Sequence, residues 1–181
     1  RASDLGQGSA RTWPSGFATL DAALPGAGWP TRGLSELLLP PQAHAEWRLL
    51  APALAALLAD EASARLYLVA PPWPPHALGL AQVGLPADRL LWLAVDEPRA
   101  RLWATEQLLQ ANAPGAILSW LPQAQAAQLR RLQVHAQACD GPVFVFRPQA
   151  ALREASAAPL RVTLDLGPGW DLRLRIPKRR G

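Results

Sequence analysis

The sequence contains little cysteine and no long apolar run. Cys139 is the one cysteine in 181 residues, which excludes a disulfide framework and a zinc site built from several cysteines. The longest apolar run, residues 49–59, contains Pro52 and falls short of the roughly 20 residues that a membrane-spanning helix needs. We therefore predict a soluble, cytoplasmic protein with no membrane contact. Because the chain begins at Arg1 and not at a methionine, we expect the natural protein to continue upstream.

The sequence also lacks the residues of a nucleotide-binding phosphate loop. Residues 34–50 have the pattern of a buried strand, a tight loop and the start of a helix, which is where a nucleotide-binding α/β protein carries that loop. The pattern G-x-x-x-x-G-K-[ST] supplies small glycines, a lysine for phosphate charge and a hydroxyl for Mg²⁺. Here the closing positions are His44, Ala45 and Glu46, and Pro40 and Pro41 precede them. We interpret these five residues as a degenerate phosphate loop that does not bind nucleotide.

No other pattern in the chain predicts catalysis or metal binding. His76 and His135 have no second ligand at helical spacing, so neither indicates a metal site. Cys139 has no base close to it in the sequence, and we expect it to be buried or inert. No G-x-S-x-G elbow is present. We predict that the protein is not an enzyme and holds no metal or cofactor.

Positive charge is concentrated at the C-terminal end. Arg173, Arg175, Lys178, Arg179 and Arg180 follow one another with no acidic residue among them, whereas the whole chain has a net charge of only +4. These residues are candidates for weak, non-specific contact with DNA phosphates, which would weaken with salt. A solvated charged terminus is the alternative interpretation.

Short apolar runs alternate with helical patterns along the chain. We predict strands at residues 34–39, 66–70, 90–95, 116–120 and 143–146, and helices at residues 45–60, 98–112 and 123–138. Continuous apolar strands separated by helices are typical of a mostly parallel sheet covered on both faces. Residues 160–166 and 170–176 alternate around a Gly-Pro-Gly turn, which predicts an antiparallel hairpin that extends the sheet. The predicted fold class is therefore a three-layer α/β fold with a C-terminal hairpin.

The length favours a single domain over residues 1–181. Within it we expect a mobile N-terminus and a helical preface over residues 1–32, with Phe17, Leu20 and Leu24 at helical spacing. The core would occupy residues 33–166. The second hairpin strand and the basic tail would occupy residues 167–181.

Several blocks of sequence, in this order, resemble one family. They are residues 16–29 (GFATLDAALPGAGW), 66–73 (LYLVAPPW), 98–109 (PRARLWATEQLL), 115–120 (GAILSW), 129–134 (LRRLQV) and 146–148 (FRP). Together with the strand that leads into a phosphate-loop position, they resemble the RecA-like fold and, more closely, the ImuA family of bacterial translesion-synthesis accessory proteins. The resemblance implies a non-catalytic scaffold of the SOS-induced mutasome.

The departures from an active RecA-like ATPase agree with one another. The second predicted strand leads into Pro71 and Pro72, where a catalytic glutamate would follow. The fourth ends in Ser119 and Trp120, where the fold would place an aspartate for Mg²⁺. The two DNA-binding loops of a recombinase are also reduced, the second to residues 148–159. The parts needed for nucleotide hydrolysis and for filament-style DNA binding are therefore both missing.

The resemblance also implies a partner and a surface for it. RecA-like proteins assemble through the edge formed by the third strand and the helix that follows it. In this chain the corresponding residues are Leu91, Leu93, Val95, Leu102, Trp103, Glu106 and Gln107. The implied partner is ImuB, which connects the complex to the polymerase ImuC, and RecA is a further candidate. Core packing is the alternative interpretation of Trp103.

Three other functions stay open from the sequence. A diverged ATPase would bind ATP and Mg²⁺. A cell-division inhibitor of the SulA type would bind the tubulin-like division protein. A regulator of RecA filaments would act by imitating a RecA subunit.

Overall fold

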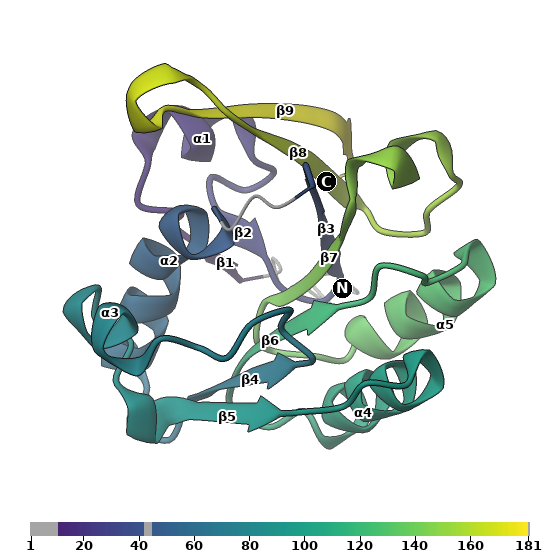
Figure 1. The fold of residues 1–181 in the computed structure, drawn as a ribbon, viewed down its shortest axis with the longest axis horizontal. Coiled ribbons are helices and arrows are strands. Elements are labelled where there is room, and N and C mark those ends of the chain that lie inside the picture. The colour runs from purple at the N-terminus through teal and green to yellow at the C-terminus, as the bar shows by residue number, and fades with distance from the viewer. Residues whose placement is uncertain (1–10, 42–44, 181) are drawn as a thin grey trace, which may run out of the picture.

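The computed structural model describes residues 11–41 and 45–180. The predicted mobile segment at the N-terminus and His44 of the predicted phosphate-loop position lie outside the described residues. Among the described residues, one seven-stranded sheet forms the centre of the molecule, with the strand order β5-β4-β6-β7-β3-β8-β9 (Figure 1).

The central strands are parallel and the last two form an antiparallel pair. Their bounds are β3 Leu34–Leu39, β4 Arg65–Val69, β5 Leu90–Leu93, β6 Gly115–Trp120, β7 Val143–Pro148, β8 Leu160–Leu166 and β9 Leu172–Arg179. β3, β6 and β7 are mainly apolar and almost entirely buried, as is typical of a parallel sheet covered by helices. The predicted fold class, including the C-terminal hairpin, is confirmed.

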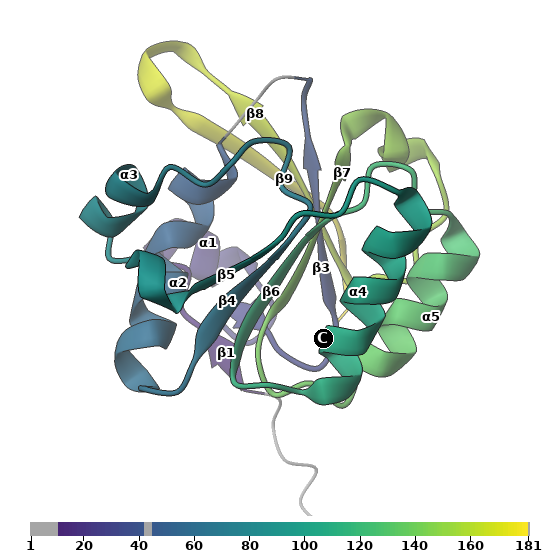
Figure 2. The same ribbon diagram turned by 60° about the horizontal axis from the view of Figure 1, so that its bottom comes forward.

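Helices cover the two faces of the sheet (Figure 2). One face carries α1 (Ala18–Ala23), α2 (Glu46–Asp60) and α3 (Ala77–Gln82), and the other carries α4 (Pro98–Ala111) and α5 (Ala126–Ala136). Leucines on α2 pack onto Leu66 and Leu68 of β4, and Leu129 and Leu132 of α5 pack onto the opposite face. None of the helices in the described part of the chain has the length and apolarity that crossing a membrane requires.

The structure differs from the sequence prediction in several boundaries. β5 ends at Leu93, so Val95 lies beyond the strand, and β9 runs from Leu172 to Arg179 and so includes Lys178. α3 was not predicted, because its six residues lie between proline-rich and glycine-containing segments. Two further short strands, β1 (Thr12–Trp13) and β2 (Trp29–Pro30), form a small antiparallel sheet of their own.

Gln133 of α5 does not point freely into solvent as a polar residue on a surface helix usually does. Its Oε1 instead accepts a hydrogen bond of 2.8 Å from the backbone N–H of Leu34, at the first residue of β3. The side chain is therefore only partly exposed. It satisfies a backbone donor at the start of a buried strand, where an unpaired N–H would be costly.

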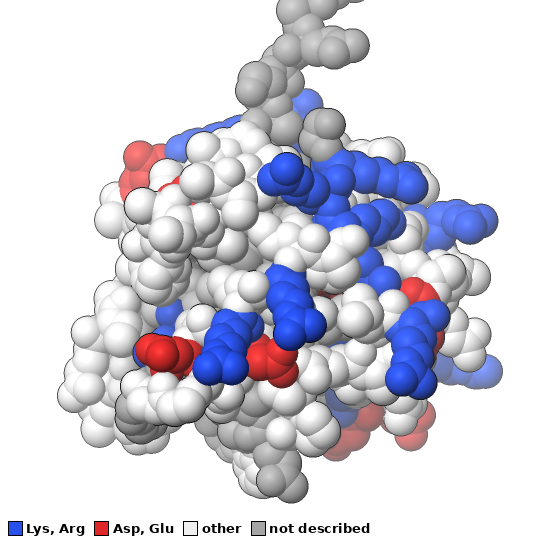
Figure 3. Space-filling model, turned by 90° about the horizontal axis from the view of Figure 1, so that it is seen from above, with Lys and Arg blue, Asp and Glu red and all other residues white. Residues whose placement is uncertain are grey.

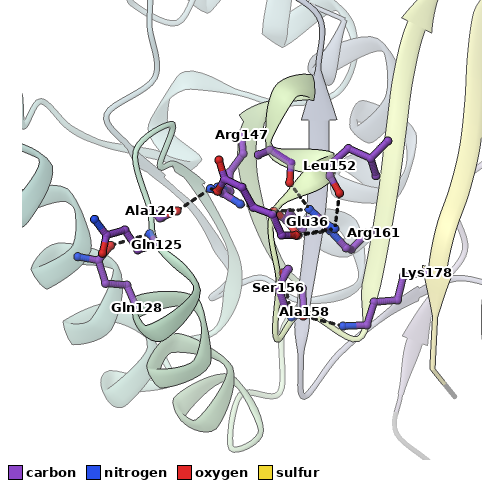
Figure 4. A network of polar contacts seen from close by, with 12 residues as sticks. Glu36, Ala124, Gln125, Gln128, Arg147, Leu152, Ser156, Ala158, Arg161 and Lys178 are labelled. Atoms are coloured by element: carbon purple, nitrogen blue, oxygen red, sulfur yellow. Dashed lines mark hydrogen bonds and ion pairs between the residues drawn. The ribbon is translucent and has the colours of Figure 1, made fainter.

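A buried cluster of charged side chains joins β3, β7 and β8 (Figure 4). Glu36 of β3 is fully buried, and its carboxylate accepts hydrogen bonds from Arg147 of β7 (2.9 Å) and Arg161 of β8 (2.6 Å). Arg161 also donates to the carbonyl oxygens of Ala151 and Leu152. The cluster thereby fixes the segment of residues 148–159, which contains the 3-10 helix η2 (Gln149–Arg153), over the carboxyl ends of the strands.

Candidate functional site

The carboxyl ends of the central strands, where nucleotides bind in many α/β proteins, are filled here by aromatic side chains. Trp120 ends β6 and stacks on Phe146 of β7, with ring centroids 4.4 Å apart. Trp47, in the first turn of α2, packs against Trp120 at 6.3 Å. Trp120 and Phe146 are buried. An aromatic stack of this kind offers no positive charge to a triphosphate.

The described residues of the predicted phosphate loop connect β3 to α2. Pro40 is partly buried and Pro41 is exposed, directly after β3 ends at Leu39. Ala45 is the N-cap of α2 and Glu46 its first residue, and both are buried. A carboxylate buried at this helix terminus would repel a phosphate group, although the terminus itself favours anions.

The polar residue at the end of β6 also has a structural partner. Ser119 is fully buried, and its hydroxyl shares a hydrogen bond of 2.9 Å with the hydroxyl of Thr105 of α4. Thr105 in turn is bonded to the carbonyl oxygen of Arg101, one turn earlier in the helix. This pair joins α4 to the sheet.

The predicted partner-binding residues lie at one edge of the sheet, where β5 is the terminal strand (Figure 1). Leu91 and Trp92 of β5 are each 48% exposed, and Trp103 of α4 is 64% exposed. Core packing therefore does not account for Trp103. The sequence prediction omitted Trp92, because it followed every second residue of the strand and Trp92 lies on the opposite face from Leu91.

Three more of the predicted partner-binding residues are at least partly buried and pack between β5, α4 and the rest of the sheet. Leu93 and Val95 are partly buried and pack against Val69, Ala70 and Ala104. Leu102 is buried in the layer between α4 and the sheet. These three side chains hold β5 and α4 together and present little surface of their own.

Polar contacts fix the outer side of α4. Glu106 accepts hydrogen bonds from Arg131 (2.7 Å) and His135 (3.1 Å) of α5, which joins the two helices. Gln107 is exposed and donates to Gln110 at 3.5 Å. The surface of Leu91, Trp92 and Trp103, which we call the β5–α4 surface, is thus carried by elements that are firmly packed.

A cavity that the sequence prediction missed lies on the other face of the sheet, between the start of α2 and the segment of residues 71–83. Its volume is about 690 Å³, and its wall is mainly apolar, with Trp47, Trp73 and Leu80 among the lining residues. Trp73 is 65% exposed. The run PPWPPH is the sequence feature that could have indicated this cavity. Consecutive prolines cannot continue a strand or a helix, so they place Trp73 in an irregular segment.

The basic residues of the C-terminal hairpin lie on β9 and just after it. Arg173, Arg175, Arg179 and Arg180 are exposed, and Figure 3 shows Lys and Arg side chains spread over this side of the molecule. Lys178 is partly buried and donates to the carbonyl oxygen of Ser156 at 2.7 Å. Burial, and then the charges of Arg180 and Arg161, lower the pKa of Lys178.

Cys139 and the histidines form no metal site in the described part of the chain, where no group of three or more His, Cys, Asp and Glu residues has suitable geometry. The Cys139 thiol is buried and donates to the carbonyl oxygen of Leu109 at 3.3 Å. Burial, and to a smaller extent the Asp140 charge, raise its pKa from 9.0 to about 11. A thiol with so high a pKa is a poor nucleophile near neutral pH.

The chain is similar in sequence and in structure to proteins of one kind. No family model matches the chain. The cell division inhibitor SulA of Edwardsiella piscicida is 30% identical over 111 residues, which cover 61% of this chain and 66% of that protein, just under two thirds of its length. The crystal structure of SulA from Pseudomonas aeruginosa superposes with a TM-score of 0.53 at 28% identity, over 64% of this chain and 97% of that one.

The chain is homologous to SulA in sequence and structure. The SulA structure matches nearly its whole length to about two thirds of this chain, so this chain contains additional residues. The narrower resemblance to the ImuA family stays a prediction.

Proposed function

We propose that this chain is a non-catalytic regulator of the SOS response that binds ImuB through the β5–α4 surface and thereby serves as a scaffold in the mutasome. ImuC would join the complex indirectly, through ImuB. The observation that carries the proposal is the exposure of Leu91, Trp92 and Trp103 at an unpaired sheet edge. Exposed tryptophans are the side chains most often found at the energetic centre of protein interfaces.

The sheet edge adds a second source of affinity. Among the described residues, β5 pairs with β4 alone, so its outer side is free to accept a strand from a partner. Trp92 and Leu91 lie on opposite faces of β5, so an added strand would meet an apolar side chain on each face. α4, which carries Trp103, forms a wall beside one of these faces.

The decisive experiment measures the affinity of the purified protein for ImuB by calorimetry. We expect Trp103→Ala and Leu91→Asp each to weaken binding at least about tenfold, since a hot-spot side chain contributes about 2 kcal/mol or more. Trp73→Ala is the matched control, because Trp73 is as exposed as Trp103 and lies beside α2, away from the β5–α4 surface. Unchanged affinity in both β5–α4 variants would reject this surface as the binding site.

The non-catalytic part of the proposal has its own test. The buried Glu46 would repel the charge of a triphosphate, and the aromatic stack of Trp47, Trp120 and Phe146 supplies no positive charge to hold one. Titration with ATP and Mg²⁺ should therefore release no binding heat. Tight binding of ATP would favour a diverged ATPase instead.

Inhibition of cell division is the second candidate function, and the named SulA relatives favour it. Expression of the chain in growing cells should then produce filaments, and the purified protein should bind the tubulin-like division protein. Normal division together with ImuB binding would favour the mutasome scaffold. Binding to RecA filaments, in the absence of ImuB, would favour the third candidate, a regulator of RecA.

A further inference from the structure

We propose that β9 and α1 form a second docking surface, which binds an extended protein segment with alternating apolar and acidic side chains. β9 is the last strand of the sheet, and among the described residues it pairs with β8 alone. Its other side is therefore open to an added strand. This surface lies at the sheet edge opposite β5, so it does not depend on the proposed function (Figure 1).

One face of β9 borders a hollow, and the side of the hollow that β9 forms is mainly apolar. Leu172, Leu174 and Ile176 alternate along the strand, are partly buried, and face α1 across a space of about 650 Å³. Leu20 and Thr19 of α1 line the other side. Since every second residue of an added strand would point the same way, the hollow selects apolar side chains at alternate positions of the partner.

The end of the hollow is closed by a specific contact. The guanidinium of Arg179 donates to the carbonyl oxygen of Ala23 at 2.8 Å, at the last residue of α1. This bond links the end of β9 to the end of α1. An edge strand beside a helix, with a space between them, is a geometry in which a peptide gains both backbone hydrogen bonds and side-chain contacts.

The opposite face of β9 is positively charged. Arg173 and Arg175 are exposed, and neither forms an ion pair with any residue in the described ranges. Their partners across the hairpin are Asp165 and Thr163, and Asp165 already accepts a hydrogen bond of 2.7 Å from Gln149. On an added strand, the residues between its apolar positions would lie beside these two arginines. The two positive charges therefore favour acidic side chains at those positions.

The same features exclude a second copy of β9 as the occupant. Pairing of two β9 strands would bring the arginines of both copies together, and like charges on neighbouring strands are destabilising. Pro177 has no N–H to donate, and the register of β9 on β8 shifts between Arg161 and Thr163. Both features limit an added strand to the part of β9 before Pro177.

A nucleic acid fits less well than a protein segment. DNA phosphates could contact Arg173 and Arg175, but they would leave the hollow beside Leu174 unfilled. The alternation of arginine with leucine and isoleucine matches a partner that is itself alternating. Of these two ligands, only a β-strand would contact both the apolar face and the basic face of β9.

The test measures binding of a fluorescent peptide of about eight residues, with alternating valine and glutamate, by anisotropy. We expect Arg175→Glu to weaken binding at least about tenfold, whereas Arg130→Glu, a charge reversal of an exposed arginine on α5, should change it less than about twofold. Thr19→Trp should also weaken binding at least about tenfold, because the indole would fill the hollow without changing any charge.

Backbone exchange provides a readout of strand addition. Bound peptide should slow hydrogen exchange of the β9 amides before Pro177 and leave those of β5 unchanged. Three results would overturn the proposal: equal binding of a peptide with lysine in place of glutamate, unchanged binding by Thr19→Trp, or a single-stranded DNA oligomer that binds more tightly than the peptide. The last result would identify the basic strand as a DNA contact.

The two surfaces can fail separately. Trp103→Ala should leave peptide binding unchanged, and Arg175→Glu should leave the affinity for ImuB unchanged. Loss of ImuB binding in Trp103→Ala together with intact peptide binding in Arg175→Glu would reject the β9 surface and keep the β5–α4 surface. The reverse pattern would do the opposite.

Discussion

Arg161 and Arg175 lie on neighbouring strands and on the same side of the sheet, yet their surroundings differ completely. Arg161 of β8 is 6% exposed and donates to Glu36, Ala151 and Leu152. Arg175 of β9 lies opposite Thr163, which is two residues after Arg161 on β8. Arg175 is exposed and forms no ion pair with a described residue. The difference lies in what covers each strand.

The covering segment is residues 148–159, which joins β7 to β8. Its carbonyl oxygens accept hydrogen bonds from Arg161, and its Glu154 carboxylate pairs with Arg147. No such segment of the described chain covers Arg175. An arginine therefore links buried segments where a loop closes over it, and its charge stays exposed to solvent where its face of the sheet is open.

The largest expected effect on stability comes from removing the buried side chain of Arg161. Arg161→Ala should lower the free energy of unfolding by about 3–5 kcal/mol, because the fully buried Glu36 would lose one of its two cationic partners. Chemical denaturation measures the change. Arg175→Ala is the control and should change stability by less than about 0.5 kcal/mol. Equal effects of the two substitutions would remove the distinction between interior and edge arginines.

The second prediction extends the comparison to a buried group that titrates. The Cys139 pKa is raised from 9.0 to about 11, so the folded state holds this proton more tightly than the unfolded state does. The stabilisation is complete below the unfolded pKa and is lost as the pH rises through the folded value, with a total loss of about 3 kcal/mol.

Stability measured against pH, with Cys139→Ala as the reference, isolates this contribution. The difference between the two proteins should be constant below about pH 8 and should then decrease up to about pH 11. Parallel curves over this range would show that the Cys139 thiol has the same pKa in the folded and the unfolded protein.

The smallest effect is expected at the boundary between the two environments. Glu154 pairs with the buried Arg147, but its own side chain is 55% exposed. Glu154→Gln should cost about 1 kcal/mol or less, because solvent screens this carboxylate and Arg147 keeps its bonds to Glu36 and to the carbonyl oxygen of Ala124. A thermal unfolding series at low and high salt would measure it. A cost as large as that of Arg161→Ala would place Glu154 among the interior groups.

Much of the fold could be predicted from local pattern. The apolar runs at β3, β6 and β7 and the alternation in the C-terminal hairpin indicated a mostly parallel sheet with an antiparallel end, and the structure has both. α3, β1 and β2 were missed, since elements of two to six residues carry too few periods to be recognised.

The candidate sites could be predicted only in part. The resemblance to RecA-like proteins placed Leu91 and Trp103 on one surface, and that site stays a prediction; the structure shows that β5 is a terminal strand of the sheet. Trp92 was missed because both faces of this strand are partly open, whereas the prediction followed one face. The hollow between α1 and β9 had no sequence signal, because its two walls are separated by roughly 150 residues of chain.

The sequence by itself determined which strands are mainly apolar, where the hairpin turns and which residues carry charge, because these properties depend on neighbours along the chain. Only the tertiary structure decided which of the arginines are buried against Glu36 and which stay free on β9, because burial depends on the segment that folds back over each strand. The order of strands in the sheet likewise arises from contacts between distant segments. That order left β5 and β9 as the two open edges on which both proposals rest.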